Sequence, residues 1–91
     1  MWFTATIRYW RPEQGGGLAV IDIPHEHVTE LGGLRQARVS GTINGAEFQS
    51  SVMPAGSGRL AMSVTKAMMK AAGAEVGSVA DFAVELSAPR K

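Results

Sequence analysis

The chain has no cysteine among its 91 residues. This absence excludes a disulfide-stabilised fold, a thiolate nucleophile and any zinc or iron site with cysteine ligands. The chain also has almost no net charge, because nine Lys and Arg residues stand against eight Asp and Glu residues. Non-specific nucleic-acid binding depends on neutralising several phosphates at once. The composition therefore argues against nucleic-acid binding, and leaves it open only if the few cations gather on one face.

Long hydrophobic runs are absent too. The opening stretch "MWFTATIRYW" has neither the basic region nor the continuous apolar region of a signal peptide, and it is too short to cross a membrane. We therefore expect a cytoplasmic protein that has no membrane partner. Hydrophobic residues make up 45% of the chain and charged residues 19%, which is typical of a folded globular protein. We expect one domain over residues 1–91, acting as a monomer or a small homo-oligomer.

Hydrophobic and polar residues alternate over much of the chain, and this period of two predicts β-strands. The expected strands cover residues 3–9, 18–23, 37–43, 46–53, 60–64 and 79–86. Asn44-Gly45 separates the third strand from the fourth, and this dipeptide favours the positive φ angles of a type I′ hairpin turn. The sequence therefore predicts a mainly β protein.

Two short helices are expected between the strands. The first covers residues 24–31, with Pro24 in its first turn and Gly32 directly after its end. The second begins after Thr65, a suitable N-cap, and ends at Gly73. Both would be about two turns long, and we expect them to cap the strands.

The order strand, glycine loop, strand, helix, strand occurs twice. A shift of 41 positions places Ile21 on Met62 and Gly32 on Gly73. A shift of 45 is needed for the first strand, and the two glycine loops, "RPEQGGG" and "PAGSGR", absorb the difference. This pattern indicates an internal duplication, although chance similarity between alternating strands is the competing explanation.

The halves would be about residues 1–44 and 45–86, followed by a frayed tail at 87–91. Neither half can bury its own apolar face alone, so a true repeat requires a core shared about a pseudo-twofold axis. The hairpin at Asn44-Gly45 would then join the last strand of one half to the first strand of the other.

Three stretches, "LAVIDIPHEHVTELGG", "VSGTINGAEFQSSVMPAGSGRLAMSVTKAMMKAAG" and "VGSVADFAVEL", resemble the bacterial and archaeal domain-of-unknown-function family numbered 1905. The resemblance implies a double-split β-barrel, a pseudobarrel with short helices at its ends, similar to the fold that AbrB and MazE regulators build from two swapped chains. Family members stand alone or are fused to a YdeI/OmpD-associated domain, and the family brings no catalytic residues. Gly77-Ser78 departs from the Gly-Asp that usually precedes the last strand.

Lys66 and Lys70 form the strongest candidate site. They lie four residues apart on the expected second helix and therefore share one face. Together with Arg59 they would make a small cationic patch suited to an anionic small molecule. A solvated helix face is the alternative interpretation of these residues.

His25 and His27 are the only histidines, and they flank Glu26. On a helix, residues two apart point in nearly opposite directions, so the two imidazoles could not bind one ion. We therefore expect no metal site, and nothing in the sequence indicates a cofactor.

Methionines are numerous for a chain of this length, and their flexible thioethers suit either core packing or an adaptable ligand cavity. The residues concerned are Met53, Met62, Met68 and Met69, with Trp2, Trp10 and Phe82 as aromatic companions.

Nucleophilic catalysis is not indicated, because no histidine is placed in a context that suggests a base with an orienting acid. The leading interpretation is a non-catalytic binding or interaction module for a small molecule or a protein partner. A nucleic-acid-binding module, by analogy with AbrB-type barrels, is one alternative. An enzyme or anion-binding protein with a site near the second helix is another.

Overall fold

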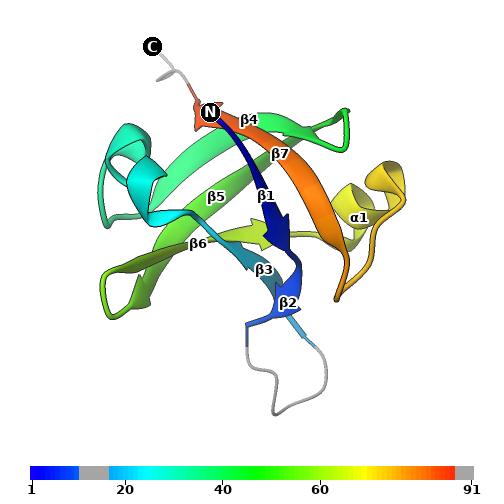
Figure 1. Ribbon diagram of the computed structural model, residues 1–91, viewed down its shortest axis with the longest axis horizontal. Helices are drawn as coiled ribbons and strands as arrows, with labels where there is room; N and C mark the ends of the chain where they lie inside the picture. Colours follow the sequence, from blue (N-terminus) through cyan, green and yellow to red (C-terminus); the bar gives the residue numbers. More distant parts are fainter. Residues whose placement is uncertain (11–16, 88–91) are drawn as a thin grey trace.

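The computed structural model describes residues 1–10 and 17–87. Within these two segments, seven antiparallel strands form one sheet in the order β1-β7-β4-β5-β6-β3-β2 (Figure 1). The strands are β1 (Trp2–Thr6), β2 (Arg8–Tyr9), β3 (Ala19–Asp22), β4 (Ala37–Ile43), β5 (Ala46–Gly56), β6 (Arg59–Val64) and β7 (Val79–Leu86). The prediction of a mainly β protein is confirmed. Most of the first glycine loop and the end of the expected tail lie outside the described residues.

The two edge strands of the sheet, β1 and β2, follow each other directly in the chain, so the sheet curls into a nearly closed barrel. The single strand expected over residues 3–9 is divided at Ile7, so that β1 pairs with β7 while β2 pairs with β3. Ile7 itself donates its N–H to the carbonyl of Ser78 (3.0 Å) and accepts the N–H of Gly77 (2.8 Å). The alternation of side chains continues through this change of partner, so the sequence pattern alone could not reveal it.

The hairpin between β4 and β5 has the turn that the sequence predicts. Asn44 and Gly45 have φ angles of 49° and 87°, as a type I′ turn requires. The Asn44 side chain has a further role, since its Oδ1 accepts the N–H of Asp81 (2.9 Å) and its Nδ2 donates to the carbonyl of Ala72 (3.2 Å). The turn is thereby joined to both β7 and the helix described next.

The predicted second helix is confirmed as α1 (Lys66–Ala72). The Thr65 hydroxyl accepts the N–H of Met68 (3.1 Å), and Gly73 ends the helix in the left-handed conformation with φ 65°. A helix of seven residues is marginal by itself in water, so burial of Met68 against the barrel contributes much of its stability.

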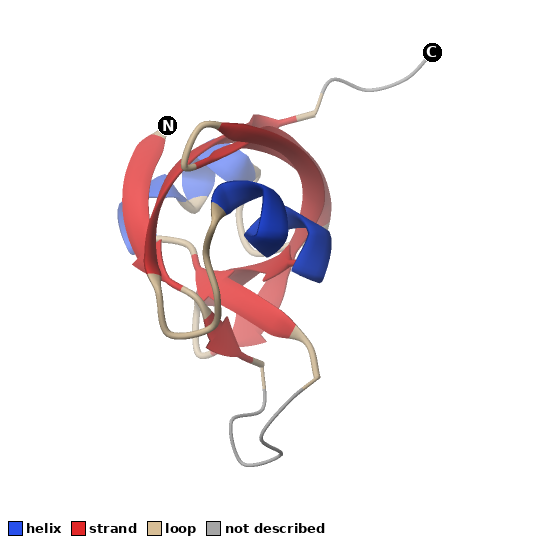
Figure 2. Ribbon diagram, turned by 90° about the vertical axis from the view of Figure 1, so that its right-hand side faces the viewer, coloured by secondary structure: helices blue, strands red, loops and turns tan. Residues whose placement is uncertain are grey.

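The prediction of a first α-helix is wrong. Two consecutive 3₁₀ turns, η2 (His25–His27) and η3 (Thr29–Leu31), take its place. Their hydrogen bonds span three residues, as in His27 N–H to Pro24 O (2.9 Å). The segment is short and its centre, Val28-Thr29, is β-branched, which disfavours a regular helix. The described residues therefore contain one α-helix, and Figure 2 shows it at the opposite end of the barrel from the 3₁₀ turns.

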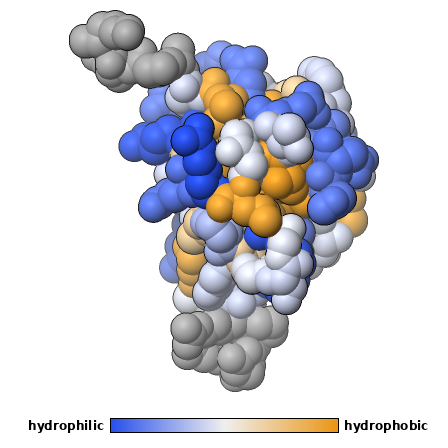
Figure 3. All heavy atoms as spheres, turned by 90° about the vertical axis from the view of Figure 1, so that its left-hand side faces the viewer, coloured by the Kyte–Doolittle hydropathy of each residue, from blue (hydrophilic) through white to orange (hydrophobic). Residues whose placement is uncertain are grey.

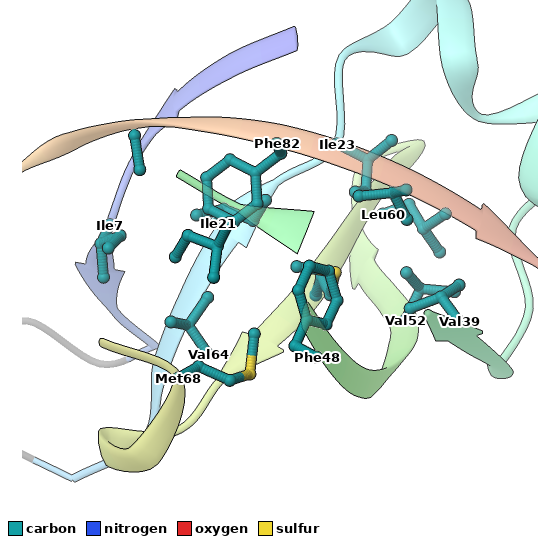
Figure 4. Close-up of a cluster of buried hydrophobic side chains, with 14 of the residues drawn as sticks. Ile7, Ile21, Ile23, Val39, Phe48, Val52, Leu60, Val64, Met68 and Phe82 are labelled. Carbon is teal, nitrogen blue, oxygen red and sulfur yellow. The ribbon is translucent and has the colours of Figure 1, made fainter. Parts of the chain in front are cut away.

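The interior of the barrel is filled by hydrophobic side chains from its strands, with Leu31 and Met68 contributed by η3 and α1. Figure 4 shows side chains such as Ile21, Phe48 and Phe82 pointing into this common space. Every buried side chain in the described residues is hydrophobic. Each fully buried large side chain contributes about 1.5–3 kcal/mol of transfer free energy. The core therefore leaves all charged groups of this part at the surface or near it.

Candidate functional site

A hollow of about 400 Å³ lies beside α1 and contains both predicted lysines. Lys66 begins α1 and Lys70 follows one turn later, so they occupy the same side of the helix, as the sequence predicts. Both are exposed to solvent. The residues that line the hollow are Tyr9, Lys66, Met69, Lys70, Ala74, Glu75 and Val76.

Tyr9 reaches this hollow because of the way the barrel closes. It belongs to β2, opposite Ala19 of β3. The loop after α1 is held against the same part of the chain by the two hydrogen bonds between Ile7 and Gly77-Ser78. The first and last thirds of the sequence thus meet at α1, and sequence spacing gave no signal of that meeting.

Ser78 fixes the shape of the loop that lines the hollow. Its hydroxyl accepts the N–H of Glu75 (3.1 Å), and its own N–H donates to the carbonyl of Glu75 (2.9 Å). A short hydroxyl side chain at this position therefore satisfies a backbone N–H of the turn and fixes the path of Gly77-Ser78.

Arg59, the third predicted site residue, is not part of this hollow. It begins β6, whereas Lys66 follows the end of that strand, which separates the two by about 20 Å. The Arg59 guanidinium donates a long hydrogen bond to the carbonyl of Ala55 (3.5 Å). The structure therefore brings two of the three predicted cations together and leaves the third at the other end of the strand.

Arg59 lies instead near an ion pair on the outer face of β2 and β3. Arg8 donates two hydrogen bonds to the Asp22 carboxylate, Nε to Oδ2 at 2.9 Å and NH2 to Oδ1 at 2.8 Å. The hydrogen bond from Arg8 lowers the pKa of the Asp22 carboxyl below its ordinary value, partial burial opposes that shift, and the charges of Arg8 and Arg59 add to it. Arg8 is thus already neutralised by a partner.

A second hollow, of about 530 Å³, opens on the outer face of β4, β5 and β7. The sequence pattern does not mark it, because its polar residues occupy ordinary outward-facing positions on three strands. The lining consists of Ser40, Gly41, Thr42, Glu47, Phe48, Gln49 and Glu85.

The model of a protein family, "Domain of unknown function (DUF1905)", matches residues 3–84. The chain belongs to this family. The DUF1905 match begins in β1 and ends in β7, so it spans the whole barrel, including Tyr9, Lys66 and Lys70. No curated protein matches the chain.

Of the two histidines of this DUF1905 chain, His27 makes local side-chain contacts. His27 Nδ1 lies 2.6 Å from Glu30 Oε1, and the imidazole lies against the ring of Phe3 with a centroid distance of 5.9 Å. His25 is exposed. Within residues 1–10 and 17–87, no three His, Asp or Glu side chains form a group that could hold a metal ion.

The methionines and aromatic residues do not form a common lining. Met62 and Phe82 are fully buried and Met68 nearly so, whereas Trp2 is 76% exposed on the outside of the barrel. Met69 alone among them lines the hollow beside α1. The core interpretation therefore holds for the buried members of this set.

The 3₁₀ end of the DUF1905 barrel differs from the α1 end. Figure 3, which views the molecule from that side, shows hydrophobic side chains gathered near the middle of the face with hydrophilic ones around them. Leu34, in the loop after η3, is 50% exposed, and Leu86, at the end of β7, is 40% exposed. In the part of the chain that the structure describes, no helix has the length and hydrophobicity needed to span a membrane.

Proposed function

We propose that this DUF1905 chain is a non-catalytic binding module whose ligand is a small organic anion held beside α1. The observation that carries the proposal is the convergence of Lys66, Lys70 and Tyr9 on one hollow. These residues come from distant parts of the sequence, and the barrel closure places them together. Sites for small molecules are typically concave, with a few polar groups converging on an apolar lining.

The chemistry of the lining specifies the ligand. The lining contains two ammonium groups, those of Lys66 and Lys70, and one carboxylate, that of Glu75, so the hollow has an excess of positive charge. Met69 and Val76 provide apolar surface, and Tyr9 provides an aromatic ring with a hydroxyl group. A carboxylate or phosphate attached to an aromatic or apolar body complements this combination.

Binding rather than chemistry is favoured by how the polar groups of the described residues are arranged. Their buried side chains are all hydrophobic, so no acid or base is held in a dry environment there. The ion pair of Arg8 and Asp22 lies on the outer face of the barrel, and neither residue lines the hollow beside α1.

The test is a thermal-shift and calorimetric titration with inorganic phosphate, benzoate, 4-hydroxybenzoate and adenosine monophosphate. We expect at least one of the organic anions to raise the melting temperature, as binding to the folded state must. The double variant Lys66→Ala/Lys70→Ala should weaken that binding about tenfold or more. Failure of all four probes to bind the wild-type chain would reject the proposal.

A matched control removes the same charge elsewhere. Arg38→Ala/Arg59→Ala deletes two exposed cations outside the hollow, and we expect binding of the organic anion to be retained. Equal losses in both double variants would show that only net charge matters. Titration with duplex DNA at low and high salt completes the set, because salt-dependent DNA binding lost in both variants would favour a nucleic-acid-binding module instead.

We also propose that the barrel is of the double-split type. In the first half, β2 pairs with β3 over only two residues, whereas β1, which precedes β2 in the chain, pairs with β7 instead. In the second half, β5 pairs with β6 from Val52 onward, whereas its earlier residues pair only with β4. In each half a helical segment contacts the strand that diverges: His27 of η2 lies against Phe3 of β1 in one half, and α1 lies against β5 in the other.

The proposed duplication is supported by the registers of the strands. Phe3 lies opposite Phe82. The shift of 45 relates Phe3 to Phe48, and the shift of 41 relates Phe82 to Gly41. Phe48 and Gly41 also lie opposite each other. The same two shifts relate the β2–β3 pair to the β5–β6 pair. Arg8 shifted by 45 is Met53 and Val20 shifted by 41 is Ala61; Arg8 lies opposite Val20, and Met53 lies opposite Ala61.

The helix ends support the duplication as well. Gly32 and Gly73, which a shift of 41 superposes, both end their helical segments with positive φ angles of 92° and 65°. The residue after each glycine donates its N–H to the equivalent carbonyl, that of Val28 in one half and Met69 in the other. Chance alternation of strands would not reproduce a matching C-terminal cap.

A further inference from the structure

The second hollow, on the outer face of β4, β5 and β7, is a groove with small side chains along its floor and longer side chains along its sides. Ser40 and Thr42 project outward from the central strand β4, and Ala83 lies opposite Thr42 on β7. Gln49 lies opposite Ser40 and Glu47 lies opposite Thr42 on β5. Small residues in the middle and longer ones on the flanking strand explain why the surface is hollow there.

Glu85 completes the second side of the groove. It lies opposite Ser40 on β7, so that Glu85, Ser40 and Gln49 form one row across three strands. Neither Glu47 nor Glu85 has an ion-pair partner within residues 1–10 and 17–87. Their carboxylates are therefore available to accept hydrogen bonds from a ligand.

Trp2 continues the neighbouring row. It lies opposite Ala83 on β1, which gives the order Trp2, Ala83, Thr42 and Glu47 across four adjacent strands. Alternation along β1 directs Trp2 outward, and 76% of its surface is exposed. Trp2 lies beside the groove and is not part of its lining. Diagonal neighbours on adjacent strands are within reach of aromatic side chains, so the indole can extend toward Glu85. An indole held outward in this way presents a flat apolar ring on which a ligand can stack.

We propose that this groove binds a saccharide. The indole of Trp2 stacks on the apolar face of one sugar ring, while Glu47, Gln49 and Glu85 exchange hydrogen bonds with the hydroxyl groups. Carboxylates accept hydrogen bonds, and the Gln49 amide and the hydroxyls of Ser40 and Thr42 both donate and accept. A polyhydroxylated ring needs this mixture together with a flat apolar surface.

The spacing of the two carboxylates favours a sugar over a metal ion or a single guanidinium. Glu47 and Glu85 are separated by two strand spacings and by two residues along the strands, or about 12 Å between Cα atoms. The carboxylates therefore flank the groove and do not meet at one point. A ligand of one or two sugar units fits between them.

The test is a series of ¹H–¹⁵N NMR titrations of the wild-type chain with maltohexaose, cellohexaose, xylohexaose and chitohexaose, each at millimolar concentration. We expect at least one sugar to shift the Trp2 indole signal and the amides of β4, β5 and β7 around the groove. The Trp10 indole follows β2 and has no place in the row of Trp2, Ala83, Thr42 and Glu47, so it serves as an internal reference. No shift with any of the four sugars would overturn the proposal.

Variants assign the binding to the groove. Trp2→Ala and Glu85→Gln should each weaken sugar binding, the first by about tenfold or more. Val79→Ala removes another exposed apolar side chain from the outer face of β7, opposite Thr6, and should leave binding unchanged. A hexa-arginine peptide is the competing probe, because shifts at the same amides with that peptide alone would make the ligand a basic peptide and reject the saccharide. Lys66 and Lys70 are not involved, so this proposal stands or fails separately from the proposed function.

Discussion

Gly41 determines how closely β4 and β7 approach each other. A Cβ atom at this position would lie 1.7 Å from the carbonyl oxygen of Ala83, well inside any permitted contact. No positive φ angle is involved, so the requirement for glycine is steric. The neighbouring backbone belongs to a strand whose Phe82 fills the centre of the core, and neither strand can move without disturbing that packing.

Gly41→Ala should therefore destabilise the protein by about 2–4 kcal/mol, through displacement of β4 from β7. Urea unfolding followed by circular dichroism measures the change. Gly58→Ala is the comparison, because its Cβ would meet no atom within 4 Å and the cost is only that of a left-handed residue at φ 74°, about 1 kcal/mol. Equal losses in the two variants would contradict the steric explanation.

The junction between β2 and β3 is the shortest in the sheet, and the ion pair of Arg8 and Asp22 reinforces it. Its side chains are 31% and 45% exposed, so water screens the pair. The native pKa of Asp22 is lowered relative to the unfolded chain. The stabilisation is therefore complete above the unfolded pKa of about 4 and is lost as the pH falls through the native value.

We expect Asp22→Asn to lower the free energy of unfolding by about 0.5–1 kcal/mol at pH 7, and to match the wild type once Asp22 is protonated in strong acid. Urea unfolding at both pH values checks the difference between the two proteins. Asp81→Asn removes an exposed carboxylate that makes no ion pair in the described residues and controls for net charge. A deficit of Asp22→Asn that persists unchanged in acid would show that the ion pair is not its cause.

The elements that could be predicted from the sequence are those encoded by local chemistry. Asn44-Gly45 specified its turn through positive φ angles, and Thr65 with Gly73 specified both ends of α1. The first helical segment was mistaken for an α-helix because Pro24 and Gly32 are equally good ends for 3₁₀ turns. The terminal residues correctly marked where the helical segment begins and ends, but its short length and β-branched centre determined that it forms 3₁₀ turns.

Only the part of the candidate site that lies on α1 could be predicted from the sequence. Lys66 and Lys70 share a face by helical spacing, so their proximity followed from the sequence. Tyr9 was missed, because its position beside α1 depends on strand pairing between distant parts of the chain. Arg59 does not lie with the lysines, because the extended strand β6 separates it from Lys66. Division of the first strand at Ile7 is the event that brings Tyr9 to α1, and no local pattern marks it.

At the scale of the whole molecule, the two proposed halves are equivalent in pairing but not interchangeable in packing. Gly41 and Phe82 occupy equivalent positions, the first with no side chain and the second with the largest in the core. Two copies of the second half would place Phe82 where only glycine fits. Each half is thus adapted to the other.

Fragments comprising residues 1–44 and 45–91 should therefore associate one to one and regain the β-sheet circular dichroism spectrum of the intact chain. Each fragment alone should lack a stable fold, since the core is shared between them. Titration of one fragment into the other, followed by circular dichroism and size-exclusion chromatography, tests this. A folded homodimer of residues 45–91 would contradict the asymmetry assigned to Gly41 and Phe82.

The pairing of β1 with β7 joins two segments that most of the domain separates in the sequence. On the ribosome, β1 cannot meet this partner until residues 79–86 have left the exit tunnel, so the barrel closes only after the rest of the domain has been synthesised. Contacts of such high sequence separation slow folding, because the whole intervening chain must be ordered before they form. Until then the nascent chain presents the edge of β4 that later receives β7, together with an open apolar interior, and both are surfaces that chaperones recognise.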